Sequence, residues 1–158
     1  MKVESILKGH VLFSKFSIEE VNRISGFSER RKYRKNDLIF DHGEKADHVF
    51  VLLQGSVFLH LPAKLEEFRI VISKVETGDL FGMSSLLGSE YYLMEAKCAE
   101  PADVLVINAK KLRNLLETDC MVGFIIMNEV ALTYLNRYFE ILNRLQGIVI
   151  QIPLITNV

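Results

Sequence analysis

The sequence lacks the cysteine and histidine spacings of disulfide scaffolds and metal sites. Only two of its 158 residues are cysteines, Cys98 and Cys120, and neither lies in a CxxC or Cys/His ligand pattern. Without such spacings we expect two ordinary thiols rather than a disulfide framework, an iron–sulfur site or a zinc knuckle. The four histidines are scattered, with no pair at the i, i+4 spacing of a metalloprotease helix, and we assign no metal.

An excess of charge of one sign and a long apolar run are also missing. The formal net charge is −1, which implies no global attraction to nucleic acid or to an anionic membrane. Charged residues interrupt the N-terminal segment, and the most apolar stretch, residues 121–135, contains Asn128 and Glu129. Neither segment suits a signal peptide or a membrane span, so we expect a cytoplasmic protein without membrane contact.

Motifs for catalysis are absent as well. The sequence contains no Gly-x-Ser-x-Gly, no P-loop and no Gly-x-Gly-x-x-Gly, and Ser84 and Ser85 have no general base beside them in the sequence. We therefore do not expect an enzyme. With 49% hydrophobic and 25% charged residues, the composition is that of one globular domain, residues 1–158, with a single core.

The first structural pattern is a short helix followed by many short strands. Ser17 and Glu20 form the Ser-x-x-Glu pattern of a capping box, which predicts a helix to about Ser25. From about residue 28 to 107, short runs rich in Val, Ile, Phe and Tyr alternate with turn residues such as Asn36 and Gly55. The predicted strands cover residues 32–35, 37–40, 48–54, 56–61, 67–75, 91–99 and 102–107. Short, closely spaced strands favour an antiparallel roll.

Helices return after the last strand. Asn108 is the expected N-cap of a helix over 109–117, and a longer helix is expected over about 120–146. The apolar tail, residues 147–158, is β-prone, and Pro153 prevents a continuing helix there. The order of elements predicts an α+β fold: an antiparallel β-roll of the double-stranded β-helix or jelly-roll type, with a short N-terminal and a long C-terminal helix.

The long helix carries two apolar stripes, more than a helix lying on one sheet requires. One stripe consists of Leu132, Leu135, Phe139 and Leu142, and the other of Met127, Val130, Tyr134, Tyr138, Ile141 and Leu145. We expect one face on the roll and the other on a second copy, which gives a symmetric homodimer through Leu132, Leu135, Phe139 and Leu142. The alternative is a helix wedged between the roll and the tail of the same chain.

The segment from Val75 to Gly88 is the most informative part of the chain. Gly78 permits a tight turn, Phe81 and Gly82 end an extended stretch, and residues 83–87 form a short helical turn closed by Gly88. Free backbone N–H groups at the start of such a turn, together with the hydroxyls of Ser84 and Ser85, form an anion cradle.

With these motifs the chain resembles the cyclic-nucleotide-binding domain family over nearly its whole length. The resemblance rests on Lys35 to Phe40 followed by Gly43, on Val49 to Gly55, and on the Gly-Asp-x-Phe-Gly run at Gly78 to Gly82. It implies the family's β-roll and a ligand pocket under residues 82–88. In the family, ligand binding shifts the long helix.

The chain departs from the family at the residues that hold the nucleotide. Where the family has a Glu for the ribose hydroxyl this sequence has Met83, and where it has an Arg for the cyclic phosphate the sequence has Tyr92, followed by Leu93. Losing both anchors removes roughly 3–6 kcal/mol of binding free energy, which turns a micromolar site into one near millimolar or weaker. Tight binding of cyclic AMP or cyclic GMP is not expected. A filled pocket, a different small-molecule effector and weak cyclic nucleotide binding stay open.

The expected function is a non-enzymatic regulatory or sensor domain. Its alternatives are a protein-interaction module with a filled pocket, which would have a protein partner, and the sensor part of a catabolite-activator-type transcriptional regulator. Since only about a dozen residues follow Leu145, we expect no direct DNA binding from this chain alone. The expected pocket residues are Phe81, Gly82, Met83, Ser84, Ser85, Leu86, Tyr92 and Leu93. Thr133, Asn136 and Arg137 are weaker candidates to cover the pocket from the helix.

Overall fold

The protein is described from a computed structural model, which covers residues 2–62 and 70–151. In chain order the helices are α1 (Val3–Gly9), the 3-10 turn η1 (Phe13–Lys15), α2 (Ile18–Ser25), the 3-10 turn η2 (Met83–Leu87), α3 (Ala109–Thr118) and α4 (Cys120–Gln151). The strands are β1 (Ser28–Tyr33), β2 (Leu38–Phe40), β3 (His48–Gln54), β4 (Val57–His60), β5 (Val71–Val75), β6 (Leu80–Phe81), β7 (Glu95–Cys98) and β8 (Ala102–Asn108). This α+β fold is the one the sequence predicts.

The strands form two antiparallel four-stranded sheets that face each other as a roll. One sheet has the order β1-β8-β3-β6 and the other β2-β7-β4-β5. The turn between β3 and β4 brings the backbone of Gly55, with φ +100°, so close to Pro101 that a Cβ there would overlap the Pro101 carbonyl oxygen. Only glycine fits this crossing between the sheets.

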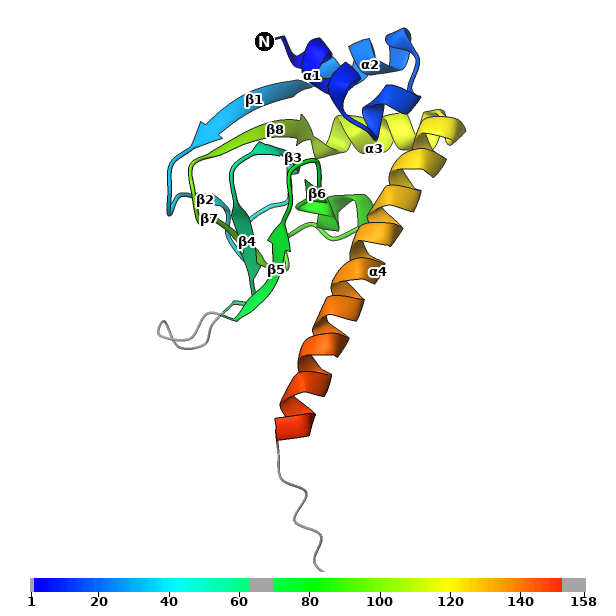
Figure 1. Ribbon diagram of the computed structural model, residues 1–158. Coiled ribbons are helices and arrows are strands. Elements are labelled where there is room, and N and C mark those ends of the chain that lie inside the picture. Colours follow the sequence, from blue (N-terminus) through cyan, green and yellow to red (C-terminus); the bar gives the residue numbers. More distant parts are fainter. Residues whose placement is uncertain (1, 63–69, 152–158) are drawn as a thin grey trace, which may run out of the picture.

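Figure 1 shows α1, α2 and α3 gathered at one end of the roll, while α4 starts there and runs along its side. Local chemistry sets the helix starts. Ser17 Oγ accepts a hydrogen bond from Glu20 N at 3.3 Å and Ser17 N donates to Glu20 Oε2 at 2.6 Å, so the predicted capping box is present. Asn108 Oδ1 accepts from Lys111 N at 3.0 Å and caps α3, as predicted.

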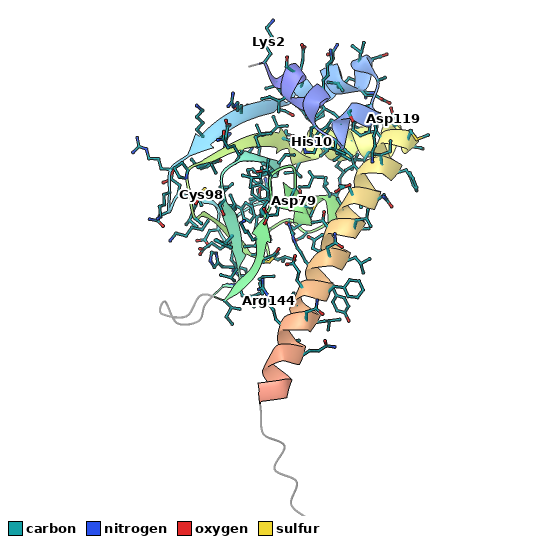
Figure 2. The ribbon with its side chains drawn as sticks, in the orientation of Figure 1. Lys2, His10, Asp79, Cys98, Asp119 and Arg144 are labelled. Atoms are coloured by element: carbon teal, nitrogen blue, oxygen red, sulfur yellow. The ribbon has the colours of Figure 1, made fainter. Side chains whose placement is uncertain are left out.

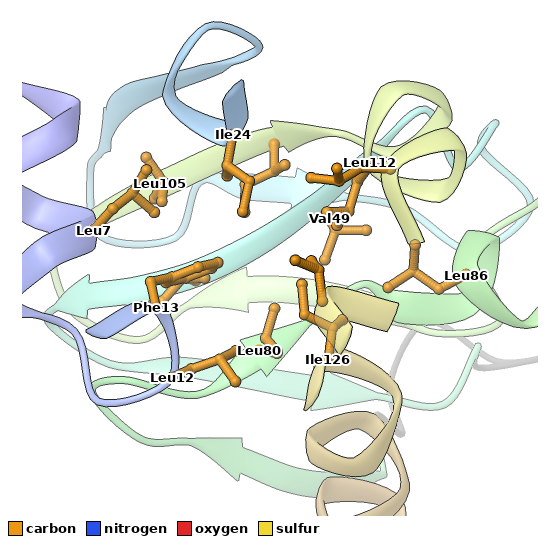
Figure 3. Packing of buried hydrophobic residues seen from close by; sticks show 14 of the residues in the cluster. Leu7, Leu12, Phe13, Ile24, Val49, Leu80, Leu86, Leu105, Leu112 and Ile126 are labelled. Atoms are coloured by element: carbon orange, nitrogen blue, oxygen red, sulfur yellow. The ribbon is translucent and has the colours of Figure 1, made fainter. Parts of the chain in front are cut away.

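Two apolar clusters hold the elements together. One lies inside the roll, between the two sheets. The other lies on the outer face of the β1-β8-β3-β6 sheet, where Leu7, Phe13 and Ile24 from the N-terminal elements meet Leu112 of α3 and Ile126 of α4 (Figure 3). The first turns of α4 are therefore anchored in a core.

Three sequence-based boundaries need correction. The helix α1 was not predicted: its N-cap Lys2 makes no side-chain hydrogen bond, and only Ile6 and Leu7 are buried, so packing rather than a local signal accounts for it. The strand predicted over 91–99 begins only at Glu95, because Tyr92 bonds through its backbone to the 43–44 turn instead. Part of the strand predicted over 67–75 lies outside the described residues.

The third correction concerns the C-terminal end. The long helix α4 ends at Gln151 rather than near residue 146, so residues 147–151 belong to the helix and not to an extended tail. A glycine such as Gly147 costs only about 1 kcal/mol inside a helix. Pro153 disfavours helix only from the residue before it. The remainder of the predicted tail lies outside the described residues.

Candidate ligand site

The candidate site is framed by the connection from β6 to η2. Gly82 joins them with φ +66°, and Gly88 ends η2 in the same left-handed region with φ +90°. A Cβ on Gly82 would lie 2.8 Å from Cδ2 of Phe50. Glycine at position 82 therefore lets η2 lie directly against the aromatic side chains of the roll.

Those aromatic side chains stack against one another inside the roll. Ring centroids are 4.0 Å apart for Phe40 and Tyr92, 5.2 Å for Phe50 and Phe81, and 5.4 Å for Phe40 and Phe50. All four residues belong to the cluster inside the roll. The space that the resemblance assigns to a ligand is thus partly occupied by aromatic rings.

Tyr92 is fixed by both its side chain and its backbone. Its hydroxyl donates to the His48 carbonyl at 2.8 Å and accepts from His48 N–H at 3.2 Å, and only 3% of the residue is exposed. Its backbone N–H donates to Glu44 O, and its carbonyl accepts from Gly43 N–H. Burial raises the pKa of the Tyr92 phenol well above its ordinary value, so this side chain stays neutral.

What remains open is a cavity of about 60 Å³. It is lined by Phe40, Leu59, Gly82, Met83, Ser84, Tyr92, Leu93, Met94, Tyr134 and Arg137. Pockets that hold drug-sized ligands usually measure about 300–1,000 Å³. The cavity is too small for a nucleotide without rearrangement.

The structure brings together part of the predicted site. Gly82, Met83, Ser84, Tyr92 and Leu93 line the cavity, and Arg137 reaches it from α4. The other predicted residues lie elsewhere: Phe81 is in the aromatic stack, Leu86 is in the outer core, Ser85 does not line the cavity, and Thr133 and Asn136 line a separate groove.

Four lining residues were not foreseen: Phe40, Leu59, Met94 and Tyr134. Phe40 ends a strand that the sequence did predict, but no local pattern says that its ring meets position 92. Tyr134 belongs to the apolar stripe that the sequence predicts to face the roll, and this stripe could have indicated that Tyr134 lies near the site. No sequence pattern predicts that Leu59 or Met94 lines the site.

Arg137 is the one charged side chain in this cavity lining, and it is buried. It is 7% exposed, its Nη2 donates to the carbonyl of Leu80 at 3.3 Å, and its guanidinium lies 6.0 Å from the ring centre of Tyr134. Among the described residues no carboxylate lies within ion-pair distance of it. Burial lowers the pKa of Arg137 from its ordinary value.

Polar contacts hold the following turns of α4 against β5. Arg144 Nη1 donates to the carbonyls of Val71 at 2.9 Å and Ile72 at 3.1 Å, and Ser73 Oγ donates to Glu140 Oε2 at 3.4 Å. Figure 2 shows Arg144 at this junction. A groove of about 390 Å³ separates the two elements. Among the described residues, the apolar contacts between α4 and the core thus lie in the first half of the helix, from Val122 to Tyr134.

A wider cavity of about 700 Å³ lies between α1 and the outer face of the sheet. On one side Arg30 Nε donates to Asp103 Oδ1 at 2.7 Å, and this guanidinium holds the pKa of the Asp103 carboxyl below its ordinary value of 3.8. On another side His10 Nε2 and the Gly78 carbonyl are 2.8 Å apart. These pairs link α1 and β1 to the rest of the roll.

Residues 2–62 and 70–151 contain no group of three or more His, Cys, Asp or Glu side chains placed to hold a metal. Within the same ranges, no helix is both long and apolar enough to cross a bilayer.

The β-roll with a glycine-framed turn beside a long helix is a fold that this chain shares with known proteins. The cyclic nucleotide-binding domain family matches residues 30–119, more than half of the chain. The chain therefore belongs to the cyclic nucleotide-binding domain family. No curated protein matches the sequence.

Solved structures share the fold. A protein from Geobacter metallireducens GS-15 described as cyclic nucleotide-binding is 29% identical, with a TM-score of 0.75 over 87% of this chain and 99% of that one. The sensor domain of the transcriptional regulator DNR from Pseudomonas aeruginosa is 16% identical, with a TM-score of 0.69 over 82% and 91%. The regulatory domain of Toxoplasma gondii PKA, solved with cAMP, is 17% identical, with a TM-score of 0.68 over 82% and 48%.

Proposed function

We propose that this protein is a non-enzymatic regulatory domain that does not bind cyclic AMP or cyclic GMP tightly. The observation that carries the proposal is the 60 Å³ cavity, because the ring of Tyr92 and its aromatic neighbours occupy the space next to the turn that would bind a nucleotide. Met83 and Tyr92 supply neither the carboxylate nor the cation that the family uses. Both are buried, at 1% and 3% exposure.

Calorimetry with cyclic AMP and cyclic GMP tests this proposal. We expect a dissociation constant near millimolar or weaker, because roughly 3–6 kcal/mol of anchoring free energy is missing. Low-micromolar binding of either nucleotide would show that the aromatic stack yields to the ligand, and it would refute the proposal.

A double substitution, Met83→Glu with Tyr92→Arg, separates a filled pocket from one that merely lacks its anchors. In a filled pocket the new charges are buried without room for a ligand, so stability falls and nothing binds. Creation of nucleotide binding in the double variant would instead show an open pocket. Thermal unfolding and calorimetry on the same sample distinguish the two outcomes.

We further propose that the domain is a cytoplasmic homodimer formed through α4. The side of α4 that faces away from the roll exposes Leu132, Leu135 and Phe139, with Leu142 half-buried beside them, and Met121, Phe124, Tyr138 and Leu145 extend this exposed band. Apolar residues that recur every three or four positions along a helix are typical of a coiled-coil seam. Two unpaired thiols, Cys98 and Cys120, are compatible with a reducing compartment.

The dimer is tested by Leu135→Glu, which places a charge in the middle of the exposed band. We expect native mass spectrometry to report a dimer for the unmodified protein and a shift to monomer for the variant. Ile18→Glu is the matched control, because Ile18 is 68% exposed on α2 and lies outside the band. A monomeric unmodified protein, or a dimer that both substitutions leave intact, would contradict the α4 interface.

An interaction module with a filled pocket is the second candidate. The exposed apolar band on α4 favours it, since the same surface suits a helix of a different protein. Mixed dimers with another chain in native mass spectra of protein taken from cells would support this candidate over self-association.

A further inference from the structure

The small cavity beside η2 has a chemical character that the aromatic stack does not explain. Its lining contains the guanidinium of Arg137 and no carboxylate. Arg137 also lines the neighbouring groove along β5, and the carboxylates around it, Glu76, Asp79, Glu129 and Glu140, lie on that side. Among the described residues, the only charged side chain that lines the cavity itself is thus a cation.

A buried cation without an ion-paired carboxylate is costly, which makes Arg137 informative. Asp79 and Glu140 act on it electrostatically, but among the described residues no carboxylate lies within ion-pair distance. Arg137 is 93% buried. Among the described residues its guanidinium makes one hydrogen bond, to the carbonyl of Leu80, which uses one of its five N–H donors. Structural arginines that are buried to this degree are usually paired with a carboxylate. Arg137 therefore has unused donors at the wall of a cavity.

Ser84 provides an independent observation. The residue is 7% exposed, and its hydroxyl is buried without a hydrogen-bond partner among the described residues. Buried hydroxyls are nearly always hydrogen-bonded, so an unpartnered one that lines a cavity indicates a ligand atom at hydrogen-bond distance. Ser84 comes from η2 and Arg137 from α4, so the two donors approach the cavity from different elements.

We infer that this cavity binds a compact oxyanion, such as phosphate or the phosphoryl head of a small molecule, between Ser84 and Arg137. This inference rests on the proposed function, because it names the ligand of the same pocket. The volume of about 60 Å³ is far below the roughly 300–1,000 Å³ of pockets for drug-sized ligands, which suits one compact group and not a nucleoside. The cation, Arg137, comes from the long helix rather than from the turn. A bound oxyanion would therefore contact both α4 and η2.

The test is a titration of the full chain with inorganic phosphate, with chloride replaced so that ionic strength stays constant. We expect saturable binding by calorimetry, and a rise in Tm of about 3–6 °C when phosphate exceeds its Kd tenfold. Ser84→Ala should weaken the Kd about tenfold or more, because a hydrogen bond to a charged group is lost. Arg137→Met should abolish the saturable response.

Two matched controls make the result specific. Ser85→Ala removes a second buried, unpartnered hydroxyl from η2 that does not line the cavity, and Arg144→Met removes a cation from α4 outside the cavity. Both should leave the Kd for phosphate unchanged within about twofold. If Arg137→Met does not fold, the comparison of Ser84→Ala with Ser85→Ala still decides.

Several outcomes would overturn the inference: no saturable phosphate response in the unmodified protein, a response that survives Arg137→Met, or equal losses in Ser84→Ala and Ser85→Ala. A parallel titration with cyclic AMP tells the two proposals apart. If neither phosphate nor cyclic AMP binds, the oxyanion site is refuted and the proposed function stands. If cyclic AMP binds tightly, the proposed function is refuted, whatever the phosphate titration shows.

Discussion

Substitutions at Tyr92 measure directly whether the pocket is filled. Tyr92→Phe deletes a hydroxyl that makes two hydrogen bonds to the backbone of His48, and we expect a loss of about 1–3 kcal/mol in the free energy of unfolding. Tyr92→Ala also removes a ring stacked 4.0 Å from that of Phe40, and large-to-small changes of a buried aromatic cost about 3–5 kcal/mol before the hydroxyl is counted. We therefore expect roughly 4–8 kcal/mol for Tyr92→Ala.

The assay is urea denaturation followed by far-UV circular dichroism at one protein concentration, because the proposed dimer would make stability depend on concentration. The neighbouring Tyr91 is the matched control. It is 52% exposed, so Tyr91→Ala should change the free energy of unfolding by no more than about 0.5 kcal/mol. If Tyr92→Ala costs less than about 1 kcal/mol and behaves like Tyr91→Ala, the Tyr92 ring is not packed and the pocket is open.

Further predictions concern the roll itself. Gly55→Ala should lower the free energy of unfolding by at least about 2 kcal/mol, seen as a lower Tm, because its φ of +100° and the neighbouring backbone exclude a methyl group. The contribution of the Asp103–Arg30 pair to the free energy of unfolding should be fully present above pH 3.8, the ordinary pKa of the carboxyl. It should be lost as the pH falls through the lowered pKa of Asp103 in the folded state. Denaturation curves of Asp103→Asn should therefore approach those of the unmodified protein only in acid. Ellman's reagent should titrate Cys120 at once and Cys98 only after unfolding, since Cys98 is 1% exposed and burial raises its pKa to about 11; two fast thiols would refute this.

Local rules account for the parts of the fold that the sequence predicted well. The Ser17 capping box, the Asn108 cap and the turn between Gly82 and Gly88 each depend on residues within a few positions of one another. The alternation of short apolar runs with turn residues is equally local, and it sufficed for the α+β class. The order of the strands in the two sheets depends on contacts between distant segments, and the sequence did not predict it. The resemblance to a family implied the β-roll but no order of strands.

The candidate site divides along the same line. The resemblance to the family, read from the sequence, predicts that Met83 and Tyr92 stand where the family has its nucleotide anchors. Only the tertiary structure decided what these residues do, because Tyr92 meets Phe40 and His48, more than forty positions away, and closes the pocket. It also decided that, of the three helix residues that the sequence offered, Arg137 lines the cavity while Thr133 and Asn136 do not. Burial and partners are set by packing between distant segments, which no window of sequence contains.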